Sequence, residues 1–260
     1  MARVSAADPS FDRHRARLEA RLQRRFCLYP ETLRLGPLVI PFVRVEDPQA
    51  VLDDVIRAES AGEPGQRLPY WAELWDSALG VGTFLASGGL AKIDPRWVAI
   101  DRARPLRAMD LGCGMGLSGR VALELGCDVL LGDIETASLL FARLNTLRFG
   151  DRARCRRVAW QRDRLGERFD LIIGADVLYG RSKWDYLEPF FRAHLDKQGR
   201  VLLGEPSRPS GDRFANWIAQ RGWNVRLFEQ RVPTHTRPIR MFCIDPQRNM
   251  RIGREIGRAH

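Results

Sequence analysis

From about residue 70 onward, short apolar runs alternate with amphipathic stretches. The apolar runs lie near 106–111, 128–133, 154–160, 169–175 and 200–204, and helical patterns separate them near 117–126, 135–148, 184–195 and 211–221. Short buried strands that alternate with helices predict a parallel sheet with helices on both faces. Two further strand-like runs, Asn224 to Glu229 and Ile239 to Ile244, have no helical pattern between them. They predict an antiparallel hairpin that closes one edge of a doubly wound α/β sheet.

The first 66 residues follow a different pattern, which predicts a small N-terminal extension of helices and strands. Residues 10–28 have the periodicity of an amphipathic helix, with Phe11, Leu18, Leu22 and Phe26 on one face and Arg13, Arg17 and Arg21 on the other. We interpret it as a packing helix with a solvated arginine face; a nucleic-acid-binding arm is the alternative. Strand-like alternation follows over 33–45, a short helical pattern over 48–59 and a Gly/Pro-rich linker over 62–69. We expect an extension at 1–66, a main domain at 67–248 and a basic tail at 249–260.

Composition and charge narrow the class of protein. Hydrophobic residues make up 45% of the chain, as in an ordinary globular protein. Arginine supplies nearly all of the positive charge behind the net +10, and the arginines are spread along the chain, which favours solvated surface charge. Acidic partners or nucleic acid are the alternative. The longest uncharged run, Ser77 to Ala91, is shorter than the roughly 20 apolar residues of a membrane span, and we see no secretory signal.

The cysteines and histidines predict neither disulfides nor a metal site. The five cysteines are odd in number and contain no Cys-x-x-Cys pair, and the four histidines have no zinc-ligand spacing. Reduced thiols in a cytoplasmic protein explain this usage best.

The strongest chemical signal is the segment Asp110-Leu-Gly-Cys-Gly-Met-Gly116, which lies between a predicted strand and a predicted helix. Glycines there let the backbone turn sharply and approach a ligand at the helix N-terminus. The dinucleotide fingerprint Gly-x-Gly-x-x-Gly would require glycine at position 117, which is Leu117. No Gly-Lys dipeptide occurs, which excludes a P-loop, and no Gly-x-Ser-x-Gly elbow occurs. Candidate ligand-binding residues are Asp110, Gly112, Cys113, Gly114 and Gly116.

A second signal is the acid at the end of the next predicted strand, in Val129-Leu-Leu-Gly-Asp133-Ile134-Glu135. A parallel sheet places Asp133 and Ile134 beside the glycine loop, where the carboxylate can accept hydrogen bonds from both hydroxyls of a ribose. A helix N-cap is the competing role for Asp133.

With these two motifs in place, residues 70–245 resemble the class I, seven-β-strand methyltransferases, which have a Rossmann-like fold and use S-adenosyl-L-methionine. The segment Pro69-Tyr-Trp-Ala-Glu-Leu-Trp75-Asp-Ser-Ala78 is similar to the Trp-containing segment of one branch, the nicotinamide N-methyltransferase-like protein-lysine methyltransferases. Val158-Ala-Trp160 looks like that branch's tryptophan beside the adenine. Tryptophans can stack on adenine and attract a sulfonium cation. The resemblance implies that Trp75, Trp160 and Ala175 also bind the cofactor.

The same resemblance points to the acceptor side of the site. Ala175-Asp176-Val-Leu-Tyr179 is similar to the Asp/Glu-x-x-Tyr/Phe motif of that branch, which implies catalytic roles for Asp176 and Tyr179. Gly204-Glu-Pro-Ser-Arg208 resembles the Gly-Asp-Pro-Gly-Arg turn of members that act on the electron-transfer flavoprotein β subunit, with Glu205 and Ser207 in place of Asp and Gly.

We therefore expect N-methylation of a lysine side chain in a protein. Asp176 and Tyr179 would orient the amine, and no nucleophilic cysteine is required. Methylation of RNA or of a small amine, and a non-catalytic assembly factor, are the alternatives. The sequence leaves the acceptor, the number of methyl groups and the oligomeric state open.

Overall fold

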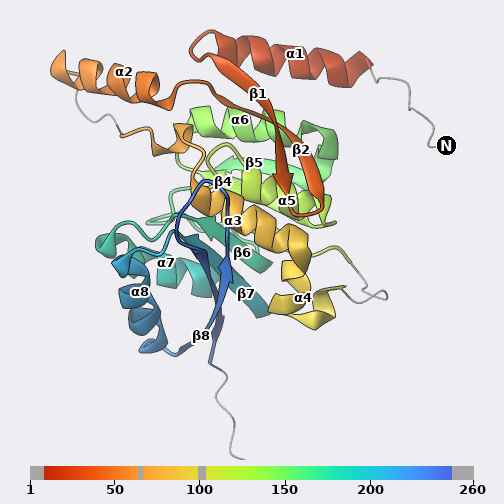
Figure 1. Cartoon of the computed structure of the whole chain (residues 1–260), viewed down its shortest axis with the longest axis vertical. Coiled ribbons are helices and arrows are strands. Elements are labelled where there is room, and N and C mark those ends of the chain that lie inside the picture. Colours follow the sequence, from red (N-terminus) through yellow and green to blue (C-terminus); the bar gives the residue numbers. More distant parts are fainter. Residues whose placement is uncertain (1–8, 64–66, 99–103, 248–260) are drawn as a thin grey trace, which may run out of the picture.

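The structure is a computed structural model that describes residues 9–63, 67–98 and 104–247 (Figure 1). Its centre is a seven-stranded sheet in the order β5-β4-β3-β6-β7-β9-β8. The strands are β3 (Arg107–Leu111), β4 (Asp128–Asp133), β5 (Ala153–Arg157), β6 (Phe169–Ala175), β7 (Leu195–Glu205), β8 (Trp223–Gln230) and β9 (Ile239–Pro246). Strands β3 to β7 pair in parallel, while β9 pairs antiparallel with both β7 and β8. The predicted doubly wound sheet with a C-terminal antiparallel hairpin is confirmed.

Helices cover both faces of this sheet, as a buried parallel sheet requires. One face is covered by α3 (Asp76–Phe84), α5 (Leu117–Glu124) and α6 (Thr136–Thr146), and the other by α7 (Arg181–His194) and α8 (Pro209–Ala219). Shorter helical segments are α4 (Leu90–Ile93), η1 (Tyr70–Ala72), η3 (Pro95–Val98), η4 (Leu147–Arg152) and the kinked η2 (Leu85–Gly89). No helix in the described residues is long and apolar enough to cross a membrane.

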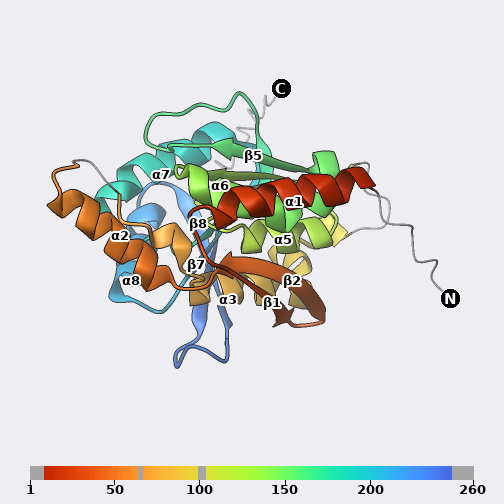
Figure 2. The same cartoon turned by 90° about the horizontal axis from the view of Figure 1, so that it is seen from above.

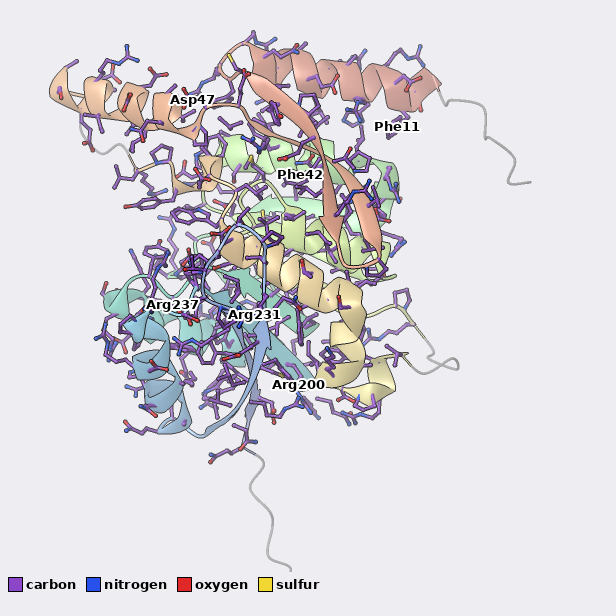
Figure 3. The ribbon with its side chains drawn as sticks, viewed as in Figure 1. Phe11, Phe42, Asp47, Arg200, Arg231 and Arg237 are labelled. Carbon is purple, nitrogen blue, oxygen red and sulfur yellow. The ribbon has the colours of Figure 1, made fainter. Side chains whose placement is uncertain are left out.

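The N-terminal region packs on the α5 and α6 side of the sheet. It consists of α1 (Pro9–Gln23), the two-stranded antiparallel sheet β1 (Leu28–Leu35) and β2 (Leu38–Val45), and α2 (Pro48–Ser60). Leu18 and Leu22 of α1 are buried in the same core as α6, as the predicted packing face requires, although the helix ends at Gln23 rather than at residue 28. Phe42 projects from β2 into the body of the molecule and is 1% exposed (Figure 3). The predicted tail at 249–260 lies outside the described residues.

Helix α3 has no counterpart among the predicted elements. Its glycines lower helix propensity, so the local pattern does not indicate a helix. In the structure these glycines allow close packing. A Cβ on Gly80 would lie 2.7 Å from the Ile239 side chain, and a Cβ on Gly82 would lie 3.0 Å from the Leu35 side chain. Close contact with β9 and β1 therefore favours glycine in this helix, and such contacts are not visible in the local sequence.

Candidate functional site

A cavity of about 790 Å³ opens at the carboxyl ends of the parallel strands. It lies where the strand order reverses, between β3 and β6, which is the usual ligand position in an open α/β sheet. Of the residues that the sequence singled out, the following line this cavity: Trp75, Asp110, Gly112, Cys113, Gly114, Asp133, Ile134, Trp160, Ala175, Asp176 and Tyr179. Gly116 does not line it.

The glycine loop connects β3 to α5 and forms one wall of the cavity. Gly112, Gly114 and Gly116 all have positive φ values, of 68°, 52° and 89°. This left-handed region is costly for other residues, so the loop needs glycine for its backbone shape. Gly116 is also packed: a Cβ there would lie 3.0 Å from Ala142 and from Leu131. Gly116 lets the chain turn into α5 and packs against Ala142 and Leu131 rather than against the cavity, so it is not part of the cavity lining.

Asp133 joins the end of β4 to this loop. Its Oδ2 accepts a hydrogen bond from the Gly114 backbone N–H at 2.9 Å, and its Oδ1 accepts one from the Glu135 N–H at 2.9 Å. The backbone N–H groups of Gly112 and Cys113 donate to the Gly132 carbonyl at 2.8 and 3.1 Å. The strand end and the loop are therefore one hydrogen-bonded unit. Burial raises the pKa of Asp133, while the two backbone donors oppose that rise.

Asp110 is the most deeply buried carboxyl in the cavity lining, at 1% exposed. Its Oδ2 accepts a hydrogen bond from the Gly119 N–H at 2.8 Å. Burial raises the pKa of Asp110 to about 7, and the nearby charge of Asp133 adds to the rise. A carboxyl with this pKa changes its charge near neutrality, and a cation in the cavity would favour its ionised form.

The tryptophans come to the cavity from two parts of the chain. Trp75 precedes α3, and its indole Nε1 donates to the Tyr70 carbonyl at 2.8 Å, which fixes the ring. Trp160 lies next to Gly112, where an added Cβ would lie 3.4 Å from its ring. The Trp160 Nε1 is buried and has no hydrogen-bond partner among the described residues. An indole N–H is a donor only, so this one is available to an acceptor on a ligand.

The opposite wall carries Asp176 and Tyr179, directly after β6. Asp176 has a φ of 55°, an uncommon value for a residue other than glycine, and its backbone N–H donates to the Gly204 carbonyl at 2.9 Å. Backbone strain of this kind is often found at functional sites. Tyr179 is 53% exposed, and its ring centroid lies 6.1 Å from that of Tyr70. The two tyrosines form the mouth of the cavity.

The structure also reveals a residue that we had not assigned to the site. Arg208, from the turn after β7, donates hydrogen bonds to the Asp176 carboxylate from both terminal nitrogens. Nη2 lies 3.0 Å from Oδ2, and Nη1 is in close contact with Oδ1. Arg208 also lines the cavity. In the sequence, Arg208 is only the last residue of a segment that resembles a turn of some family members. The sequence does not show which carboxylate this arginine pairs with.

A buried ionic network holds that turn in place. Glu205, at 2% exposed, accepts hydrogen bonds from the Ser207 N–H at 3.1 Å and the Arg208 N–H at 2.9 Å, and it pairs with Arg240 of β9. Ser207 has a φ of 55°, so the serine adopts a conformation that glycine adopts easily. Its hydroxyl donates to the Pro238 carbonyl at 2.6 Å, which compensates part of that cost.

Asn145 of α6 is a second unpredicted residue, because it connects the N-terminal hairpin to the glycine loop. Its side chain accepts from the Val43 N–H at 2.8 Å and donates to the carbonyls of Val43 and Met115 at 2.9 and 3.0 Å. An asparagine within a helix gives no sequence signal for such distant partners. Within the part of the chain that the structure describes, no group of three His, Cys, Asp or Glu side chains could hold a metal ion.

Comparison with known proteins gives the family. A model of the lysine methyltransferase family matches residues 69–220. Protein N-lysine methyltransferase METTL21A of Xenopus tropicalis is 30% identical over 139 residues, which cover 51% of this chain and 58% of that protein. Ribosomal protein L11 methyltransferase of Campylobacter jejuni is 29% identical over 134 residues, 48% of this chain and 42% of that protein. The chain thus spans about half the length of the curated relatives that it matches.

Among solved structures, 1,6-didemethyltoxoflavin-N1-methyltransferase of Burkholderia thailandensis has the same fold, with a TM-score of 0.54 and 15% identity over 84% of this chain and 99% of that one. The glycopeptide N-methyltransferase MtfA gives a TM-score of 0.51 and 13% identity over 62% of this chain and 90% of that one. Both likenesses confirm the Rossmann-like methyltransferase fold. The family model spans more than half of the residues and includes the glycine loop, Asp133, Asp176 and Tyr179, so the chain belongs to the lysine methyltransferase family.

Proposed function

We propose that this protein transfers a methyl group from S-adenosyl-L-methionine to the side-chain amine of a lysine in a protein substrate. The observation that carries the proposal is that one cavity joins the Gly114–Asp133 unit to the Asp176–Tyr179 wall. The family supports the same activity. The five cysteines form no disulfide among the described residues, which supports a reducing compartment such as the cytoplasm.

The residues of the cavity fit this cofactor. Asp133 has lone pairs left to accept hydrogen bonds from ribose hydroxyls, and the glycine loop leaves room for close approach to its backbone. Trp160 and Trp75 offer aromatic faces to the adenine and the sulfonium, and the unpartnered Trp160 Nε1 offers a donor. Burial raises the pKa of the Asp110 carboxyl to about 7, and a bound cation would favour its negatively charged form. When bound, the cofactor supplies a methyl group already activated by its sulfonium, so the protein mainly positions the reactants.

The acceptor amine must be neutral before it can attack. A free lysine amine has a pKa of about 10.4, and a partly dry site lowers it. In the structure the negative charge of Asp176 is already balanced by Arg208, so the pair gives little net stabilisation to an ammonium. Asp176 therefore orients the amine through an oxygen lone pair and does not act as a strong base.

Tyr179 complements Asp176 at the mouth of the cavity. Burial of part of its ring raises the pKa of Tyr179, so its phenol stays protonated at neutral pH. The ring can pack along the lysine stem while the hydroxyl remains available as a hydrogen-bond partner.

Radiolabelled methyl transfer from S-adenosyl-L-methionine tests the proposal. A lysate treated with the enzyme is separated into protein, RNA and small-molecule fractions, and labelled protein is hydrolysed to its amino acids. We expect label in methylated lysine, and a rate of labelling lower by about 10- to 100-fold with the Asp176→Asn variant. Label confined to RNA or to small amines would assign a different acceptor, and cofactor binding without any transfer would indicate a non-catalytic module.

A further inference from the structure

Helix α2 carries an apolar stripe, although none of its residues is buried. Val51 packs against the core, while Leu52, Val55, Ile56 and Ala58 lie on one side of this amphipathic helix and stay partly or largely exposed. Ile56 is 47% exposed. Figures 1 and 2 both show α2 projecting from the body of the molecule. A 13-residue helix on its own is marginally stable in water, so this stripe is more consistent with a contact surface than with a core element.

The segment that contains α2 has the opposite charge from the rest of the protein. Residues 46–63 contain six carboxylates (Glu46, Asp47, Asp53, Asp54, Glu59, Glu63) and one arginine, Arg57, which gives a formal charge of −5 in a chain of net charge +10. Only Asp54 among the α2 carboxylates forms an ion pair within the described residues, and that pair, with Arg57, is largely exposed. An acidic surface of this kind attracts a basic partner.

Helix α2 also lies next to the mouth of the cavity. The chain leads from its C-terminal end to Leu68 and Tyr70, which line the mouth, and both views show segment 67–72 beside the helix. Leu68, Tyr70 and Tyr179 are exposed by 45%, 52% and 53%. The exposed apolar side chains of Leu68 and Tyr70 therefore follow α2 in the sequence and lie at the entrance that an acceptor side chain would use.

We propose that α2, with Leu68 and Tyr70, is the docking surface for a basic, amphipathic segment of the protein substrate that contains the acceptor lysine. The inference deepens the proposed function and rests on it. Apolar side chains of the segment would cover the α2 stripe, and its lysines and arginines would face Asp53, Asp54 and Glu59. A second copy of this chain fits less well, because its own acidic helix would be repelled, and RNA phosphates would be repelled for the same reason.

The probe is a pair of synthetic 18-residue peptides, each with one central lysine and the same apolar pattern. One peptide carries arginines and the other carries glutamates at the polar positions. Fluorescence anisotropy measures the binding of each peptide to the full chain in the presence of S-adenosylhomocysteine. We expect the basic peptide to bind at least tenfold more tightly than the acidic one, with an affinity that falls as salt rises.

Two sets of variants separate docking from folding. Leu52→Ser with Ile56→Ser should weaken binding of the basic peptide by about tenfold, while Leu227→Ser, an equally exposed site on β8, should not change it. Asp53→Lys with Asp54→Lys should reverse the preference toward the acidic peptide. Loss of the helix cannot produce this gain. Calorimetry with S-adenosylhomocysteine should give the same affinity for all variants, which tests the cofactor site independently of docking.

Three results would overturn the proposal. Equal binding of both peptides, or no binding of either, would show that this surface does not select a basic partner. Unchanged affinity in the α2 variants would place the contact elsewhere. A dimer in sedimentation experiments that dissociates on Ile56→Ser would assign the stripe to self-association instead. Any of these results with normal S-adenosylhomocysteine affinity would leave the cofactor site of the proposed function intact.

Discussion

At the scale of single residues, the pKa of Asp110 makes both stability and cofactor binding depend on pH. Its pKa rises from 3.8 to about 7 on folding, so between these values the folded protein holds a proton that the unfolded chain has released. The contribution of Asp110 to stability is therefore complete below pH 4 and is lost as pH rises through 7. Thermal unfolding of wild type and Asp110→Asn should show the variant gaining stability relative to wild type between pH 5.5 and 8.5.

The same ionisation predicts the pH dependence of binding. S-adenosyl-L-methionine carries a net positive charge, so it should favour ionised Asp110 and bind more tightly at pH 8 than at pH 6. Calorimetry at pH 6 and pH 8 should show a change in affinity of about tenfold or less, since the interaction of one pair of unit charges in a solvated site is worth about 1 kcal/mol. A pH dependence that persists in Asp110→Asn would assign it to another group.

Arg208 and Asp176 should act together in methyl transfer. Asp176→Asn and Arg208→Gln are each expected to lower kcat by about 10- to 100-fold, because each removes one half of the bidentate pair that fixes the carboxylate. The affinity for S-adenosylhomocysteine should stay within about twofold of wild type. Arg208→Lys keeps the charge but loses the fork, so it should recover only part of the rate. Loss of both rate and cofactor affinity would indicate misfolding.

At the scale of elements, the turn after β7 depends on a buried carboxylate. Glu205→Gln should lower the free energy of unfolding by about 3 kcal/mol, because Arg240 would lose its buried partner. Asp212→Asn is the matched control: this acid pairs with the same arginine but is 70% exposed, so its loss should cost less than about 1 kcal/mol. Urea titrations of the two variants measure the difference. Equal losses would show that burial of Glu205 does not matter.

The elements also show where sequence reasoning succeeds and where it fails. The glycine loop and Asp133 could be predicted because each lies at a strand end, and adjacent parallel strands bring those ends together. The Asp176–Arg208 pair could not be predicted, because its partners are 32 residues apart and meet through the left-handed backbone of Asp176 and Ser207. Helix α3 was missed for a similar reason: Gly80 and Gly82 reflect contacts with Ile239 and Leu35, far along the chain.

At the scale of the whole molecule, charge is divided between surfaces. The chain is basic overall, while residues 46–63 beside the mouth of the cavity are acidic. A uniformly basic protein would attract nucleic acid to every face, whereas this division favours a basic protein segment at the entrance. The N-terminal region is joined to the same core, through Leu18, Leu22 and the hydrogen bonds of Asn145, so the entrance and the cofactor loop are held by one structure.

The most direct test of the central claim is calorimetric titration of the full chain with S-adenosylhomocysteine, for wild type, Asp133→Ala and Asp128→Ala. Asp128 lies at the opposite end of the same strand, outside the cavity, and serves as the control. We predict binding to wild type and to Asp128→Ala with equal affinity, and a loss of about 100-fold or more in Asp133→Ala, since charged hydrogen bonds are worth roughly 1.5–3 kcal/mol each. Absence of binding to wild type, or normal affinity in Asp133→Ala, would contradict the assignment of this cavity to a methyl-donor nucleoside.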